Sequence, residues 1–171
     1  MELVSLSDLN ISVEYPEEGS TFEANALGKA RFYHALTGLP TVADDSGLFV
    51  DALADELGVK TRRWGAGEKA TDEEWLHFFM QRMAEEKDRG ARFVCVAAYV
   101  DEQQEMAFEG ETLGVITETV EAPIQAGIPL SSVFKAEGCA IVYSALSPAE
   151  KAACSHRGKA FGQLFHFLKN A

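Results

Sequence analysis

The chain has 171 residues, of which 47% are hydrophobic and 25% are charged. This balance is typical of a globular protein and excludes a largely disordered chain. The formal net charge of −12, from 27 acidic and 15 basic residues, argues against a nucleic-acid polymer as partner, because its phosphates would be repelled. A small anionic ligand remains compatible with this charge where carboxylates hold a divalent cation between protein and phosphate.

The cysteine pattern and the N-terminal sequence bear on the cellular compartment. Cys95, Cys139 and Cys154 show no paired spacing, which is typical of free thiols in a reducing compartment. The segment Met1–Asn10 has neither a basic head nor a long apolar run, so we expect no signal peptide and no transmembrane span. These features predict a cytoplasmic protein without a membrane partner.

The first third of the chain predicts a strand, a helix and a strand–turn–strand unit. Glu2–Leu6 is expected to form a short strand. Ser20 and Glu23 have the spacing of a capping box, which predicts a helix over about Thr21–Leu36. Apolar residues on both sides of Asp44–Gly47 then predict two short strands joined by a tight turn.

The rest of the chain predicts two helices and two extended segments. Thr71 and Glu74 form a second capping-box pattern, and Ser147, Pro148 and Glu150 form a third helix start. The helices expected there cover about Thr71–Glu85 and Pro148–Lys169, and Gly158 is a point at which the second could be interrupted. The extended segments are Arg92–Val100, expected to be buried on both faces, and Met106–Val120, expected to break at Gly110 and Gly114. No repeat or linker is found, which favours a single α/β domain over residues 1–171.

Acidic residues supply the first candidate site. If Asp44 and Asp45 end a buried strand, their carboxylates lie at a sheet edge, where one could bind a metal and the other could take a proton from water. The alternative is a plain tight turn, because Asp, Ser and Gly are turn formers. Glu17 and Glu18 precede the first helix and could either favour its dipole or contribute to a cation site.

Basic and polar residues near the start of the last helix supply the second candidate. Lys151 and Arg157 could hold phosphate oxygens, with Ser155 and His156 beside them. The alternative is a solvated basic stripe. The remaining histidines are expected to be packing residues, and neither a zinc-ligand spacing nor a glycine-rich phosphate loop is present.

Taken in order along the chain, these segments resemble the inosine/xanthosine triphosphate pyrophosphatase family. The resemblance spans almost the whole sequence, and no single motif carries it. The matching positions are Glu17–Phe22, Asn25, Ala26, Lys29, Ala43–Leu48, Arg63, Ala91–Cys95, Phe108–Glu111, Gly114, Ser147–Lys151 and Ser155–Gly158.

The resemblance implies a mixed, twisted sheet flanked by helices, with a cleft between two lobes, and a homodimer. It also implies Mg²⁺-dependent hydrolysis of nucleoside triphosphates between the α and β phosphates, with preference for deaminated purines. The catalytic roles would fall to Asp45 and Lys151. The metal ligands would come from Asp45, Asp44, Glu17 and Glu18, and the substrate contacts from Lys151, Ser46, Ser155, His156 and Arg157.

Two departures from the family pattern leave alternatives open. The sequence starts at the family's second strand region, so we expect the first strand, the first helix and a phosphate-binding lysine to be absent; alternatively, the gene begins upstream. The family's base-stacking segment is replaced by Ile128–Ser132, without its aromatic residue and its Asp. The leading hypothesis is a divergent pyrophosphatase, and the rival is a relative that binds nucleotides or partners without turnover.

Overall fold

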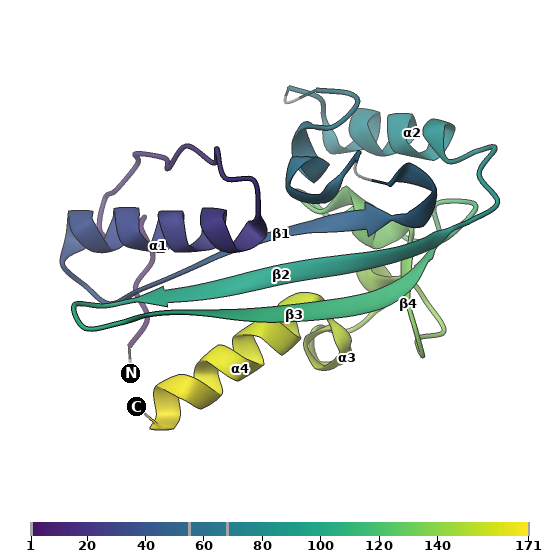
Figure 1. The fold of residues 1–171 in the computed structure, drawn as a ribbon. Helices are drawn as coiled ribbons and strands as arrows, with labels where there is room; N and C mark the ends of the chain where they lie inside the picture. The colour runs from purple at the N-terminus through teal and green to yellow at the C-terminus, as the bar shows by residue number, and fades with distance from the viewer. Residues whose placement is uncertain (1, 55, 68, 171) are drawn as a thin grey trace.

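The computed structural model describes residues 2–54, 56–67 and 69–170, with the side chain of Arg63 left out. Helices flank a twisted sheet, which confirms the expected α/β architecture (Figure 1). The strands are β1 (Thr41–Val50), β2 (Gly90–Val100), β3 (Glu105–Ile116) and β4 (Phe134–Ala136). The α-helices are α1 (Phe22–Thr37), α2 (Asp72–Arg82), α3 (Pro148–Cys154) and α4 (His156–Asn170). Short 3₁₀ helices are η1 (Asp51–Leu53), η2 (Gly58–Arg63), η3 (Pro129–Ser132) and η4 (Tyr143–Ala145).

The four described strands pair antiparallel in the order β1-β2-β3-β4. The pairing of β1 with β2 is continuous from Thr41 opposite Val100 to Val50 opposite Ala91. The prediction of a turn at Asp44–Gly47 is therefore wrong, because β2 offers ladder partners along the whole segment and this outweighs the local turn preference. For the same reason, Gly110 and Gly114 do not interrupt β3.

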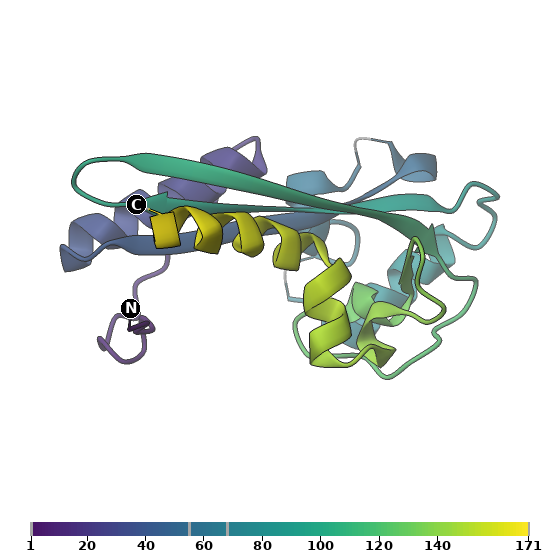
Figure 2. The ribbon, with the colours of Figure 1, turned by 90° about the horizontal axis from the view of Figure 1, so that it is seen from below.

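Helices α1 and α4 cover opposite faces of the sheet, as Figures 1 and 2 show. Side chains of a strand alternate between its faces, so consecutive residues of β2 serve different helices. Val94, Val96 and Ala98 pack with α1, whereas Cys95 and Ala97 pack with α4. The same alternation applies to β1 and decides where its two aspartates point.

The largest core cluster lies at the other end of the sheet, under α2 and the 3₁₀ helices. Its aromatic members include Trp75, Phe79, Phe134 and Tyr143, all of which are almost fully buried. Trp75 stacks on Phe79 with a ring-centroid distance of 5.6 Å. This packing fixes η3 and η4, which form part of the wall of the cavity described below.

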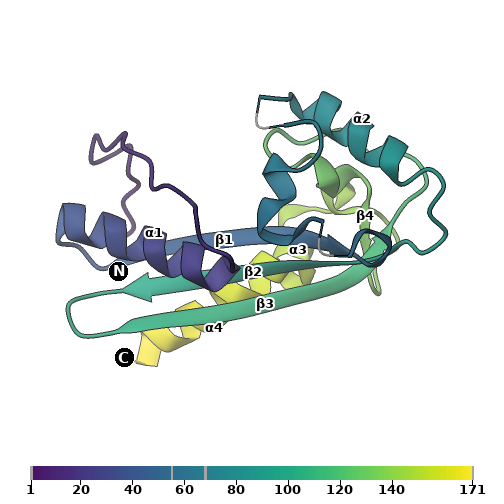
Figure 3. The same ribbon diagram turned by 45° about the horizontal axis from the view of Figure 1, so that its top comes forward.

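Local capping signals set most helix starts. The capping boxes of Thr71 with Glu74 and of Ser147 with Glu150 are both formed, as predicted. Helix α1 is capped by Thr21 rather than Ser20. The predicted strand at Glu2–Leu6 is wrong, since this part of the chain forms no strand and belongs to the irregular segment that precedes α1 (Figure 3). None of the described helices is long and apolar enough to span a membrane.

Candidate functional site

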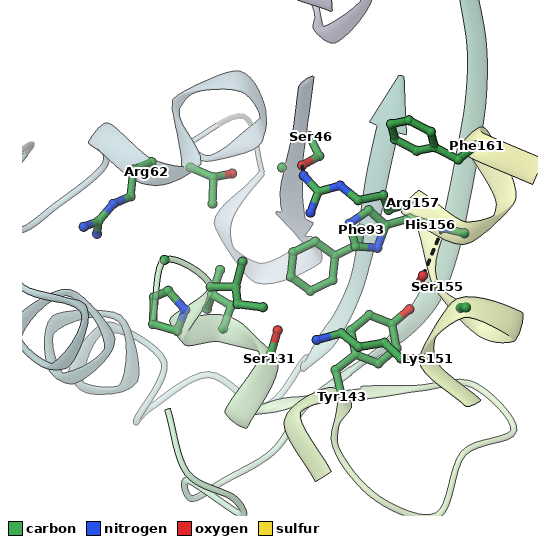
Figure 4. Close-up of a pocket in the computed structure, with 18 of the residues that line it drawn as sticks. Ser46, Arg62, Phe93, Ser131, Tyr143, Lys151, Ser155, His156, Arg157 and Phe161 are labelled. Atoms are coloured by element: carbon green, nitrogen blue, oxygen red, sulfur yellow. Dashed lines mark hydrogen bonds between the residues drawn. The ribbon is translucent and has the colours of Figure 1, made fainter. Parts of the chain in front are cut away.

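A cavity of about 640 Å³ opens at one edge of the sheet, between β1, η3 and the corner that joins α3 to α4. Figure 4 shows the side chains that surround it. Three of the described lining residues are basic, namely Arg62, Lys151 and Arg157, and none is Asp or Glu. Arg62 is paired with Asp72 at 3.4 Å and Arg157 with Asp44 at 2.8 Å. In a chain with a net charge of −12, Lys151 therefore supplies the positive charge that marks this cavity as a place for an anion.

Lys151 projects from α3 into this cavity (Figure 4). Its ammonium Nζ donates a hydrogen bond to Oε1 of Gln125 at 3.1 Å and lies 5.8 Å from the ring centroid of Tyr143. Burial lowers the pKa of Lys151, and the neighbouring Arg157 lowers it further. Among the described residues, no carboxylate forms an ion pair with Lys151.

The helix predicted over Pro148–Lys169 divides at Ser155, three positions before Gly158, where the sequence left an interruption open. The backbone of Ser155 is extended (φ −78°, ψ 151°), and its Oγ accepts a hydrogen bond from the Gly158 N–H at 3.0 Å. Ser155 therefore ends α3 and caps α4, while still lining the cavity. This corner turns Lys151 and Arg157 toward the same cavity from two helices.

His156 forms the inner wall beside this corner. Its ring stacks on Phe93 with centroids 4.7 Å apart, and only 9% of the residue is exposed. Burial lowers the pKa of His156 to about 3, with a further contribution from Arg157. His156 is therefore neutral at physiological pH and offers an aromatic surface rather than a charge.

Arg157 contacts β1 from across the cavity. Its Nε and Nη2 both donate to Oδ2 of Asp44, at 3.0 and 2.8 Å, and Nη2 also donates to Ser46 Oγ at 3.2 Å. Asp44 and Ser46 thus point to the α4 face, as their shared parity along β1 requires. Asp44 forms an ion pair that orients Arg157, and its role as a metal ligand stays a prediction.

Asp45 points to the opposite face, toward α1. Its Oδ2 accepts a hydrogen bond from Asn25 Nδ2 at 2.9 Å, and its Oδ1 lies 3.8 Å from Lys29 Nζ. The same ammonium lies 2.7 Å from Glu17 Oε1. Burial raises the pKa of Asp45, and the nearby Glu17 carboxylate adds to this effect. Glu18 is exposed.

The structure brings most of the predicted site residues to the cavity, but it separates the two predicted catalytic residues. Ser46, Lys151, Ser155, His156 and Arg157 all line the cavity, whereas Asp44 and Asp45 do not. In the tight turn predicted from the sequence, the side chains of Asp44 and Asp45 could have pointed to the same side of the sheet. In a strand they cannot, because its successive side chains alternate between faces.

Three polar residues of this region were given no role by the sequence reasoning. Asn25 and Lys29 lie four apart on α1, directly after the acidic loop, and this spacing places them on one helix face. This spacing can be recognised in the sequence alone. Gln125 lies in an irregular segment before η3, so nothing local linked it to Lys151, which is 26 positions away.

Comparisons with known proteins agree with this architecture. The profile of the Ham1 family matches residues 1–167. A dITP/XTP pyrophosphatase of Leptospira interrogans is 36% identical over 169 residues, covering 99% of this chain and 85% of the relative. One of Mycobacterium tuberculosis is 40% identical over 172 residues, covering 99% and 83%.

Solved structures give the same result at the level of the fold. The Staphylococcus aureus Ham1 protein superposes with a TM-score of 0.86 at 30% identity, covering 99% of this chain and 87% of that one. A nucleoside-triphosphatase / dITP/XTP pyrophosphatase from Mycobacterium abscessus gives 0.71 at 39% identity, covering 95% and 83%. From the profile match and these relatives together, the chain belongs to the Ham1 family.

Proposed function

We propose that this protein hydrolyses non-canonical purine nucleoside triphosphates to the monophosphate and pyrophosphate. Relatives named dITP/XTP pyrophosphatase, at 36 to 40% identity over nearly the whole chain, support the substrate class. The observation that carries the proposal is the cavity with three basic and no acidic described lining residues in an acidic protein. Its aromatic walls suit a purine, and its cations suit phosphates.

The nucleotide is proposed to lie across the free edge of β1. Consecutive residues of this strand serve both polar clusters: Ser46 lines the cavity with Arg157, whereas Asp45 joins Asn25 on the α1 face. A base held near Phe93 and His156 would leave its phosphates near Lys151 and Arg157. The α phosphate would lie at the strand edge, within reach of the carboxylates beyond it, and the β and γ phosphates would lie beside the two cations.

Magnesium is proposed to bind at Glu17 and Asp45. Both carboxylates already contact one cation, the ammonium of Lys29, which shows that the place suits positive charge. Among the described residues, no three His, Cys, Asp or Glu side chains form a metal cluster. Two carboxylates nevertheless fit Mg²⁺, which is commonly held by one or two of them together with substrate phosphates. The ion would shield the phosphate charge and polarise the phosphorus–oxygen bonds.

Asp45 is proposed to take the proton of the attacking water. The hydrogen bond that Asn25 Nδ2 donates to Asp45 Oδ2 at 2.9 Å fixes the orientation of this carboxylate for the role. Lys151 and Arg157 would hold the negative charge that grows on the leaving pyrophosphate as the bond between the α and β phosphates breaks. We propose that this reaction takes place in the cytoplasm.

The experiment is a pyrophosphate-release assay with inosine, xanthosine, adenosine and guanosine triphosphates, with and without Mg²⁺. We expect release from the first two, dependence on Mg²⁺, and strong loss in Lys151→Met. Lys87→Met, an exposed lysine in the loop after α2, is the matched control. Tight binding of these nucleotides without any release would contradict hydrolysis and favour the rival, a non-catalytic nucleotide-binding protein.

A further inference from the structure

Lys151 lines the cavity and, among the described residues, has no carboxylate partner that would offset its positive charge. Its ammonium has three N–H donors, and the described partner of one of them is the amide oxygen of Gln125, at 3.1 Å. A carboxylate at that distance would satisfy the same donor and cancel the charge. An amide satisfies the donor and leaves the charge in place.

Gln125 is itself held in position. The side-chain Nε2 of Gln125 lies 3.4 Å from the backbone carbonyl oxygen of Ser144, which is a long hydrogen bond. The backbone carbonyl oxygen of Gln125 accepts a hydrogen bond from the Ile128 N–H at 3.1 Å. Two residues further on, the Gly127 N–H donates to Oδ2 of Asp72 at 2.6 Å, which ties this segment to the start of α2. The half-buried amide is thus presented to Lys151 by a segment anchored on both sides.

We propose that Gln125 is the positioning residue for Lys151, and that its neutrality keeps the ammonium available for a phosphate group of the substrate. This inference rests on the proposed function for the identity of the substrate. It does not assign Gln125 any contact with the reacting atoms.

The surroundings of Lys151 explain why a neutral partner is needed. The titratable groups that share the cavity wall or lie behind it are Arg62, Arg157, His156, Tyr143 and Cys154. His156 is neutral, Arg157 is paired with Asp44, and Arg62 is paired with Asp72. A further ion pair, at Lys151, would leave little uncompensated charge in the cavity.

The decisive variant is Gln125→Glu, which keeps the shape and the acceptor and adds one negative charge. Gln103→Glu, in the exposed turn between β2 and β3, makes the same change of net charge far from the cavity and is the control. Inorganic triphosphate is the probe, because its binding tests the charge without depending on turnover. We expect Gln125→Glu to weaken this binding by about tenfold or more while the melting temperature is kept or raised, since the new ion pair stabilises the fold.

Two further readouts separate positioning from a structural role. In Gln125→Glu, the new carboxylate raises the pKa of Lys151, so the alkaline limb of kcat/KM for inosine triphosphate should move to higher pH. Gln125→Ala should raise KM and leave this limb nearly unmoved, and Gln125→Asn should recover less than the full affinity because its amide is one methylene shorter.

These measurements distinguish a wrong role for Gln125 from a wrong proposal of nucleotide hydrolysis. If the wild-type chain binds triphosphate and Gln125→Glu binds it as Gln103→Glu does, the role of Gln125 is refuted whether or not the enzyme turns over. If Gln125→Glu weakens binding as expected but no nucleotide is hydrolysed by the wild type, the proposed function fails and the role of Gln125 in anion binding stands. A fall in melting temperature equal in Gln125→Glu and Gln125→Ala would also contradict the proposal.

Discussion

Replacing Asp45 by Asn separates catalysis from folding at a single side chain. In the wild type, Asn25 Nδ2 donates a hydrogen bond to Asp45 Oδ2 at 2.9 Å. The asparagine keeps the size of the side chain and an oxygen that can accept this hydrogen bond. It removes the negative charge that the proposed mechanism needs as base and metal ligand. We expect turnover to fall by about 10²–10³-fold, or about 3–4 kcal/mol, as for loss of a main electrostatic group in an active site.

The effect on stability should be small, and its sign follows from the structure. The 3.8 Å separation from Lys29 Nζ gives a gross attraction of about 4 kcal/mol at an effective dielectric constant of about 20. The raised pKa of Asp45 nevertheless means that burial and the Glu17 carboxylate outweigh this attraction and the Asn25 hydrogen bond. Charged Asp45 therefore costs stability at neutral pH, and the change in unfolding free energy should be neutral or favourable by up to about 1 kcal/mol, or about 2–4 °C.

The two effects are measured on one preparation, by pyrophosphate release and by thermal unfolding at pH 7. Glu102→Gln, in the exposed turn between β2 and β3, is the matched control for the loss of one negative charge. A variant that keeps its turnover within a few-fold of wild type and unfolds more than about 5 °C lower would refute the argument. Asp45 would then be a structural residue.

Four further predictions follow from the same geometry. Asp44→Asn keeps an oxygen that can accept from the Arg157 guanidinium but removes the charge that offsets it, so KM for the triphosphate should fall several-fold while the Mg²⁺ requirement is unchanged, as a titration with Mg²⁺ would show. Gly110→Ala places a Cβ about 2.2 Å from His156 O, so the melting temperature should fall by about 4–8 °C, or about 2 kcal/mol. Because the pKa of His156 is lowered to about 3, the unfolded chain takes up a proton there that the native chain does not; stability should fall as pH drops from about 6.5 toward 3, and less so in His156→Phe. No described strand pairs with the outer edge of β1, and the part of this edge away from Asp45 and Ser46 favours a homodimer, which light scattering at micromolar concentration should detect; a strictly monomeric protein would contradict that prediction.

Local signals predicted the helices well. Thr71 with Glu74 and Ser147 with Glu150 form capping boxes because the interacting groups are only three positions apart and need no help from the rest of the chain. The ends of the helices were predicted less accurately than their starts. The helix divides at Ser155, three positions before Gly158, where a Cβ would lie 1.9 Å from the carbonyl oxygen of Ala152, so the turn between α3 and α4 requires glycine there.

The sequence named several residues that the structure places around one cavity, but it did not predict how the aspartates are arranged. Lys151, Ser155, His156 and Arg157 line one cavity because a helix start and a helix corner keep sequence neighbours together. The division of Asp44 from Asp45 could not be read from the sequence. It depends on the pairing of β1 with β2, whose partners are about 40 to 60 positions apart along the chain, and this pairing turns a segment of turn-forming residues into a strand.

The most direct test of the central claim is the initial rate of pyrophosphate release from inosine triphosphate by the wild-type protein in Mg²⁺, measured beside adenosine triphosphate. The account predicts release from inosine triphosphate that disappears when the metal is chelated, and a much lower rate with adenosine triphosphate. Bound inosine triphosphate that stays intact in the presence of Mg²⁺ would contradict it.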